Sequence, residues 1–289
     1  MSTRPAVIVI SSHVVRGTVG NRAAALALEV MGFPVWTVPT ITLPWHPGHG
    51  PATRIVPPTE SFAAMLADLE NAPWLGEVGA VLSGYLGNAE QVAPVASLVE
   101  AVKRANPLAR YTLDPVLGDG DALYIPQAQA EAMRDTLLPL ADIATPNGFE
   151  LGWLTGHLRA TQQHETLASA QALGPKLVLA TSSPALREGA TANLMLDGTR
   201  ALVAEHTLLD GPPNGLGDLT AALLLGHILR GDSTAEALSL TTSAVAEVMA
   251  MSANAGSDEL LLEQSLQSIL KPRTPIATRQ LMVTKRRPA

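Results

Sequence analysis

Short runs of apolar, often branched residues recur along this chain and alternate with longer segments of mixed polarity. Such runs, bounded by turn signals, are typical of strands buried in a parallel sheet. They occur at Ala6–Ile10, Pro34–Val38, Gly79–Ser83, Tyr111–Asp114, Asp142–Thr145 and Leu177–Thr181. The intervening segments predict helices at about 21–31, 61–69, 89–105, 127–137 and 163–173. Strands that alternate with helices indicate a mainly parallel sheet covered by helices on both faces.

The pattern changes in the second half and in one early segment. Asp197-Gly198 separates two short apolar runs, Leu194–Leu196 and Ala201–Val203, which predicts a β-hairpin. Residues 39–58 are rich in proline and glycine and predict a flap rather than core. Three more helices are expected at about 218–230, 234–255 and 258–270, with a C-terminal tail at about 272–289. Because no repeat or linker divides the chain, we expect residues 1–289 to form one domain.

The stretch Gly211-Pro-Pro-Asn-Gly-Leu-Gly-Asp218 precedes the most apolar of these helices. Gly215 and Gly217 bracket Leu216, so the backbone N–H groups at the helix start are open to an anion such as a phosphate. Asp218 has two interpretations. It is a helix cap, or it is a base that removes a proton from a hydroxyl attacking a phosphoryl group.

Composition limits the range of functions. Of 289 residues, 47% are hydrophobic and 16% charged, which favours a packed core. The net charge of -7 argues against a nucleic-acid binder, and the basic run Lys285-Arg286-Arg287 is expected to be a solvated end. The lack of cysteine excludes thiol catalysis and fits a reducing compartment. No apolar run is long enough for a signal peptide or a membrane span, so we expect a soluble cytoplasmic protein.

Polar residues gather where the predicted strands end, which is where α/β sheets bind ligands. Ser12, His13, Ser83–Tyr85, Asp114, Thr145–Asn147, Thr181 and Ser182 all occupy such positions. Asp114, Asp119 and Glu150 add carboxylates to this edge. Carboxylates without thiols suit a hard cation such as Mg²⁺, held mostly through water and phosphate.

Taken together, these motifs resemble those of the pyridoxal kinases, which belong to the ribokinase-like superfamily. The resemblance rests on Ser12-His-Val-Val-Arg-Gly17, Val19-Gly-Asn21, Leu82-Ser-Gly-Tyr85, Asp114-Pro-Val-Leu-Gly-Asp119, Ala141-Asp-Ile-Ala-Thr-Pro-Asn147, Glu150, Thr181-Ser182 and Gly215-Leu-Gly-Asp218. It runs from residue 6 to about 270. It implies a three-layer α/β/α fold with a central mainly parallel sheet and a flap near the substrate site.

The resemblance also implies a reaction and roles for single residues. The reaction is the ATP-dependent phosphorylation of the 5′-hydroxymethyl group of pyridoxal. Asp218 matches the catalytic base, and Gly215, Leu216 and Gly217 match the anion hole. The acceptor pocket is implied to contain Ser12, Val19, Trp45, His46, Pro47, Tyr85 and Asp218. Nucleotide contacts are implied for Asp114, Thr145, Asn147, Glu150, Thr181, Ser182, Leu208, Leu209, Asp210, Gly211 and Leu216.

Cations and partners follow from the same resemblance. Mg²⁺ is expected near Asp114, Asp119, Thr145 and Glu150, with a monovalent cation such as K⁺ near Asp114 and Thr145. The partners implied are ATP, a small B6-type acceptor and a second copy of the chain in a homodimer.

The chain departs from the family in its flap, where Trp45-His46-Pro47 replaces the usual Asn-His-Thr. Two alternatives therefore stay open. One is a kinase of another hydroxymethyl heterocycle, such as a hydroxymethylpyrimidine. The other is a non-catalytic B6-binding relative, although the retention of Asp218 and the other acids speaks against it. His46 and His49, with no third ligand nearby in sequence, predict a polar loop rather than a metal site, and His227 is expected in the core.

Overall fold

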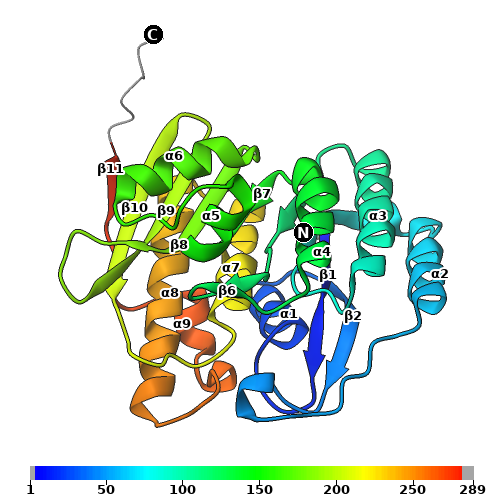
Figure 1. The fold of residues 1–289 in the computed structure, drawn as a ribbon, viewed down its shortest axis with the longest axis horizontal. Helices are drawn as coiled ribbons and strands as arrows, with labels where there is room; N and C mark the ends of the chain where they lie inside the picture. The colour runs from blue at the N-terminus through cyan, green and yellow to red at the C-terminus, as the bar shows by residue number, and fades with distance from the viewer. Residues whose placement is uncertain (1–3, 282–289) are drawn as a thin grey trace.

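The computed structural model describes residues 4–281, which form a nine-stranded sheet with helices on both faces (Figure 1). The strand order is β11-β10-β9-β8-β7-β4-β3-β1-β2. The parallel part consists of β1 (Ala6–Val14), β2 (Val35–Leu43), β3 (Val78–Ser83), β4 (Arg110–Leu113), β7 (Ile143–Ala144) and β8 (Leu177–Pro184). The antiparallel part adds β9 (Ala190–Asp197), β10 (Arg200–Thr207) and β11 (Thr278–Leu281). The predicted mainly parallel sheet and the predicted hairpin are confirmed.

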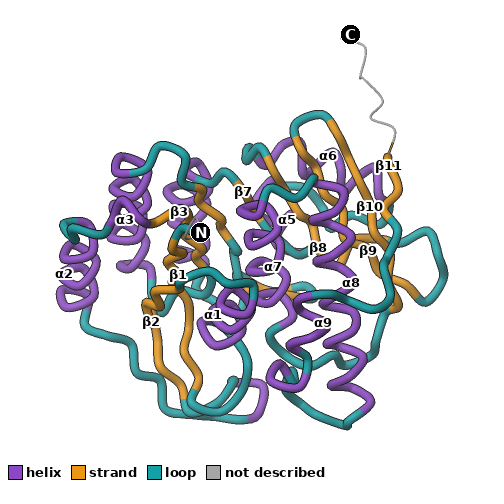
Figure 2. Tube along the Cα trace, turned by 180° about the vertical axis from the view of Figure 1, so that it is seen from behind, coloured by secondary structure: helices purple, strands orange, loops and turns teal. Residues whose placement is uncertain are grey.

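The helices divide between the two faces of the sheet. One face is covered by α2 (Thr59–Glu70), α3 (Val92–Ala105), α4 (Gln127–Ala132), α5 (Gly148–Thr155) and α6 (Gln163–Leu173). The other face, turned toward the viewer in Figure 2, carries α1 (Asn21–Val30), α7 (Leu216–Arg230), α8 (Thr234–Asn254) and α9 (Leu266–Leu270). The expected three-layer arrangement is therefore present.

Strand β1 shows why the sheet needs helices on both faces. Ile8 and Ile10 pack in the cluster with α2 and α3, whereas Val7 and Val9 pack in the cluster with α1 and α7. All four side chains are fully buried. Successive side chains of a strand point to opposite faces, so an unbroken apolar run must be covered on both.

The flap is shorter than residues 39–58. β2 continues to Leu43, so Pro39–Leu43 belongs to the sheet, and Pro39 is tolerated because β2 is an edge strand. We keep the name flap for residues 44–58, which contain a short 3₁₀ turn at Pro47–His49 and an antiparallel bridge between Ile55 and Thr42.

The C-terminal region also differs from the prediction. The helix expected at 258–270 is reduced to a 3₁₀ turn at Leu262–Gln264 and the short α9, because Glu259 is drawn into a parallel bridge with Asn214. The tail expected from 272 contains β11, which pairs antiparallel with β10 from Ala204↔Thr278 to Ala201↔Leu281. The basic run at 285–287 lies outside the described residues.

Two elements had no counterpart in the predicted order, the helix α5 and the small hairpin of β5 (Gly118–Asp119) and β6 (Ala122–Leu123). His227 is buried as expected, and its Nδ1 lies 2.6 Å from Asp232 Oδ2. Within residues 4–281, no helix combines the length and apolar character that a membrane crossing requires.

Candidate active site

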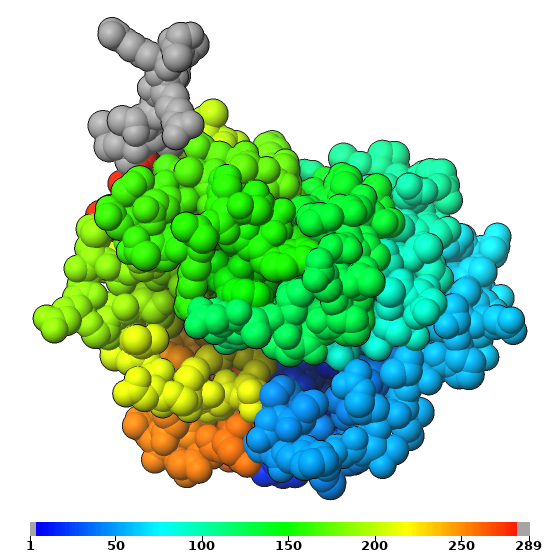
Figure 3. Space-filling view, viewed as in Figure 1, coloured from blue at the N-terminus to red at the C-terminus, as the bar shows by residue number. Residues whose placement is uncertain are grey.

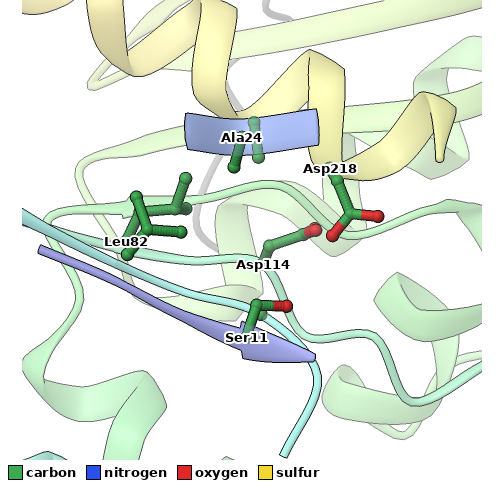
Figure 4. Close-up of a pocket in the computed structure, with 8 residues that line it drawn as sticks. Ser11, Ala24, Leu82, Asp114 and Asp218 are labelled. Carbon is green, nitrogen blue, oxygen red and sulfur yellow. The ribbon is translucent and has the colours of Figure 1, made fainter. Parts of the chain in front are cut away.

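A small cavity of about 10 Å³ lies where β1, β3 and β4 end beside the start of α7. Its polar lining comes from Ser11, Asp114 and Asp218, whose side-chain oxygens point toward a common space (Figure 4). A bulge between Ser11 and His13 in the pairing of β1 with β2 gives this strand end its irregular shape. The molecular surface is hollowed close by, where the small hairpin, the loop before α7 and the flap meet (Figure 3).

The residues predicted to form an anion hole, Gly215, Leu216 and Gly217, lie at the start of α7. Gly215 is the N-cap residue with φ +95°, and a Cβ there would lie 2.2 Å from the Thr18 carbonyl oxygen. The first helical hydrogen bond runs from Leu219 N–H to Gly215 O, so the N–H groups of the first turn have no helical partner. A Cβ on Gly217 would meet no atom within 4 Å, so a ligand can approach this side. We call residues 214–217 the anion loop.

Asp218 is not the cap of α7, because Gly215 occupies that position and makes no side-chain cap bond. Burial raises the pKa of Asp218 to about 6, while the backbone N–H groups of Gly20 and of Asp218 itself hold the carboxylate and limit the rise. Gly20 lies tightly against Ser12, since a Cβ there would be 2.2 Å from the Ser12 carbonyl oxygen. The end of β1 and the start of α7 are therefore joined at this carboxylate.

Asp114 faces Asp218 from the opposite wall of the cavity and is 5% exposed. Thr145 Oγ1 donates a hydrogen bond of 2.8 Å to Asp114 Oδ1. Burial raises the pKa of Asp114 well above its ordinary value, and the charges of Asp218 and Glu150 raise it further. A cavity that collects repelling carboxylates favours a cation.

Glu150 stands apart from the other predicted acids because its carboxylate is committed to the backbone. Its Oε1 accepts from Leu117 N–H at 2.8 Å, and its Oε2 accepts from Asn147 N–H at 2.9 Å, as part of a capping box at the start of α5. Burial nevertheless raises its pKa to about 7. Glu150 thus fixes the 117–118 segment against Asn147.

Asp119 is exposed on β5, where its carboxylate accepts a hydrogen bond from Gly120 N–H. Among residues 4–281, no three His, Cys, Asp or Glu side chains are close enough to hold a metal by themselves. Carboxylate and hydroxyl oxygens, the types present in Asp114, Asp119, Thr145 and Glu150, are those that Mg²⁺ prefers, and a magnesium ion here would need phosphate and water to complete its coordination.

The predicted nucleotide residues divide into two groups. In the first group, Asn147 and Thr181 form a parallel bridge, and Thr181 N–H donates to Pro146 O. Ser182, whose φ is +52°, lies against Gly148. The second group, Leu208, Leu209, Asp210 and Gly211, lies on the mostly exposed loop between β10 and α7. Only the first group is bonded to one of the predicted acids, through the Asn147 N–H that donates to Glu150.

The predicted acceptor residues are partly assembled. Val19 is buried in a small apolar cluster against which Tyr85 packs, and Tyr85 N–H donates to Ser11 Oγ. In the flap, Trp45 is 37% exposed and its indole N–H donates to Gly50 O. His46 accepts a hydrogen bond from Gly48 N–H, and Pro47 begins the 3₁₀ turn. Trp45 and His46 thus bond within the flap, whereas Tyr85 is bonded to Ser11, which lines the cavity.

Three further residues belong to this site although the sequence did not assign them. Ser11 lines the cavity and Gly20 holds Asp218. Tyr124 is 56% exposed, and partial desolvation together with the charges of Glu150, Asp114, Asp218 and Asp119 raises its pKa. Tyr124 and Tyr85 also line a hollow of about 380 Å³ with Arg54. Ser11 could have been found from its place beside Ser12, but no local signal marks Tyr124.

The chain is similar to known kinases. A family model described as phosphomethylpyrimidine kinase matches residues 64–262. The pyridoxal kinase PdxY of Corynebacterium diphtheriae is 34% identical over 280 residues, covering 95% of this chain and 99% of the relative. PdxY of Rubrobacter xylanophilus is 37% identical over 273 residues, covering 92% and 94%.

Among solved structures, the pyridoxal kinase of Leishmania donovani in complex with ADP and pyridoxamine superposes with a TM-score of 0.90 at 26% identity. The match covers 96% of this chain and all of that one, which confirms the ribokinase-like fold. The chain therefore belongs to the pyridoxal kinase family, within the wider group that the phosphomethylpyrimidine kinase model describes.

Proposed function

We propose that this protein transfers the γ-phosphoryl group of ATP to the 5′-hydroxymethyl group of pyridoxal and so produces pyridoxal 5′-phosphate for B6 salvage. One observation carries the proposal. Asp218 lies in the first turn of α7, directly behind the anion loop, and faces the cavity that it shares with Asp114. A base beside unpaired N–H groups is what phosphoryl transfer to an alcohol needs.

In this mechanism Asp218 accepts the proton of the acceptor hydroxyl as its oxygen attacks the γ-phosphorus. A pKa of about 6 leaves most of this carboxylate ionised at neutral pH and keeps it more basic than an exposed aspartate. The N–H groups of Leu216 and Gly217 stabilise the negative charge on the transferring phosphoryl group. Asn147, Thr181 and Ser182 would bind the nucleotide from the neighbouring strand ends.

Mg²⁺ fits the cluster of Asp114, Asp119, Thr145 and Glu150, and when bound it would offset the charge of the triphosphate. We extend the proposal to a monovalent cation such as K⁺ near Asp114 and Thr145, whose oxygens are only 2.8 Å apart. Glu150 supports these sites by holding the 117–118 segment and Asn147 in place.

The acceptor would lie against Ser12, Val19 and Tyr85, with the flap residues Trp45, His46 and Pro47 above it. The names of the relatives favour a B6 vitamer over a hydroxymethylpyrimidine, and the paired acids favour catalysis over mere binding. We place the reaction in the cytoplasm, in line with a chain that has no cysteine.

An ATP-consumption assay across pyridoxal, pyridoxine, pyridoxamine and a hydroxymethylpyrimidine tests the substrate. We expect the highest kcat/KM with a B6 vitamer. A higher kcat/KM with the hydroxymethylpyrimidine would show that this compound, and not a B6 vitamer, is the acceptor. If ATP is consumed with none of the four compounds, the protein is a binding protein rather than a kinase of these acceptors.

We also propose a homodimer. Val15 and Ile55 are 66% and 61% exposed, and both lie near the edge strand β2. Exposed apolar side chains beside an edge strand favour association. Light scattering of the purified protein is expected to give twice the chain mass, and a monomer at micromolar concentration would contradict this.

A further inference from the structure

Glu259 is a buried carboxylate outside the reaction site, and its contacts join three separate segments of the chain. The residue is 7% exposed. Its Oε2 accepts a hydrogen bond from Thr18 N–H at 3.1 Å, and its Oε1 lies 2.8 Å from His49 Nε2 in the flap. Its backbone forms the parallel bridge with Asn214.

The loop at 16–20 has a shape that admits this carboxylate. A Cβ on Gly17 would lie 2.5 Å from Glu259 Oε1, and the φ of Gly17 is +111°. Thr18 Oγ1 also donates to Leu260 O, and the Thr18 carbonyl oxygen touches Gly215 of the anion loop. The same loop continues to Val19 and to Gly20, whose N–H holds Asp218.

Charged groups surround Glu259 on its exposed side. Arg16 lies 3.6 Å from Glu259 and 3.1 Å from Asp258, and Asp258 is 3.4 Å from His49 Nδ1. The Asp258 side chain is 56% exposed, whereas that of Glu259 is 10% exposed. Both acids that reach His49 also contact the loop at 16–20, but Asp258 does so through the exposed side chain of Arg16, whereas Glu259 accepts a hydrogen bond from the backbone N–H of Thr18.

We infer that Glu259 is a positioning residue that holds the flap, through His49, and the loop at 16–20 against the anion loop, and thereby sets the affinity for the acceptor. His49 has no role in the proposed reaction, although the sequence pairs it with His46 in the flap. The inference rests on the proposed function only in that the acceptor lies between the flap and Asp218.

Steady-state kinetics of His49→Ala, Glu259→Ala and the double variant test this inference. Each single variant is expected to raise the KM for pyridoxal about tenfold and to leave the KM for ATP within about twofold, because the flap contact is lost and the nucleotide side is not. The effects of the two changes on the KM for pyridoxal should not multiply in the double variant, since both remove the same contact between His49 and Glu259. Glu259→Gln, which keeps an acceptor for Thr18 N–H, should restore part of the affinity.

Asp258→Asn is the matched control, because it removes a neighbouring negative charge that also faces His49 and Arg16. It should change the KM for pyridoxal less than twofold. An equal effect in this variant, or multiplicative effects of His49→Ala and Glu259→Ala, would overturn the inference. His49→Ala alters a side chain near the surface, so it keeps the test decisive even if Glu259→Ala fails to fold.

Trypsin cleavage after Arg54 gives a readout that is independent of activity. Arg54 lies in the flap and donates a hydrogen bond to Tyr85 Oη. Cleavage after Arg54, followed by mass spectrometry, should be several times faster in His49→Ala than in the parent or in Asp258→Asn. Unchanged cleavage contradicts the inference, whereas a parent that does not phosphorylate pyridoxal contradicts the proposed function alone.

Discussion

Thr145 Oγ1 donates a hydrogen bond of 2.8 Å to Asp114 Oδ1, and this contact joins the carboxyl ends of the neighbouring strands β4 and β7. It leaves Asp114 with one carboxylate oxygen toward the cavity shared with Asp218. Both acids line this cavity, where we propose that the acceptor hydroxyl and the phosphoryl group meet.

Asp218→Asn should lower kcat by about 10²–10⁴-fold, because the amide cannot accept the hydroxyl proton. Nucleotide affinity, measured by calorimetry, should change only a few-fold, since Asn147, Thr181 and Ser182, which we propose as nucleotide contacts, follow β7 or lie on β8 rather than on α7. Asp68→Asn on the exposed surface of α2 serves as a control. If Asp218→Asn keeps more than half of the parent's kcat, the carboxylate is not the base.

The pH dependence of kcat/KM should follow the protonation of Asp218. The base works only when ionised, and burial raises its pKa to about 6. Activity is therefore expected to rise as the pH increases from 5 to 7 and then to level off. A profile that is already flat at pH 5 would argue against this carboxylate as the titrating group.

Asp218→Asn should also stabilise the protein at pH 8. The folded state holds the Asp218 proton more tightly than the unfolded chain, so stability falls as the pH rises from about 4 to about 6, and the full cost of the ionised carboxylate is present above about pH 6. This cost is absent below about pH 4, the ordinary range of an aspartate. Urea unfolding should show a gain on the order of 1–3 kcal/mol at pH 8 that vanishes near pH 4.

Asp119→Ala and Glu150→Ala should have different consequences. Asp119→Ala should raise the Mg²⁺ concentration needed for half-maximal activity, because it removes a proposed magnesium contact. It should leave stability unchanged, because the Asp119 side chain is exposed. Glu150→Ala leaves buried N–H groups of Leu117 and Asn147 without their acceptor, which should cost about 2–4 kcal/mol of unfolding free energy. Magnesium titration and urea unfolding of both variants distinguish these effects. An unchanged magnesium requirement in Asp119→Ala would remove Asp119 from the proposed cation site.

Gly217→Ala and Gly215→Ala test the anion loop. A Cβ on Gly217 meets no protein atom, so that variant should fold normally, with a change below about 0.5 kcal/mol. The new methyl group would enter the space of the phosphoryl group and lower kcat by about 10–100-fold. Gly215→Ala should instead lose more than about 1 kcal/mol of stability, because its Cβ would collide with the Thr18 carbonyl oxygen at φ +95°. Normal kcat in Gly217→Ala would show that phosphate does not approach this glycine.

Local sequence signals were sufficient for much of the fold. Short-range patterns predict buried strands such as β1 and helices such as α6. Gly215 and Gly217 at the start of α7 indicate a helix start that is open to an anion. Asp114, Thr145 and Asp218 could be selected because they stand at strand ends or at a helix start, and the resemblance supplied their implied roles.

Only the tertiary structure decided the features that depend on distant partners. Pro39–Leu43 is a strand because it pairs with β1, and Thr278–Leu281 is a strand because it pairs with the edge of β10. Glu259 is not in the predicted helix because it forms a bridge with Asn214. Tyr124 lies near Glu150, Asp114, Asp218 and Asp119, and His49 contacts Glu259. No local sequence pattern indicates these contacts. Hydrogen bonding and burial between segments far apart in sequence set these outcomes, so a pattern of neighbouring residues could not contain them.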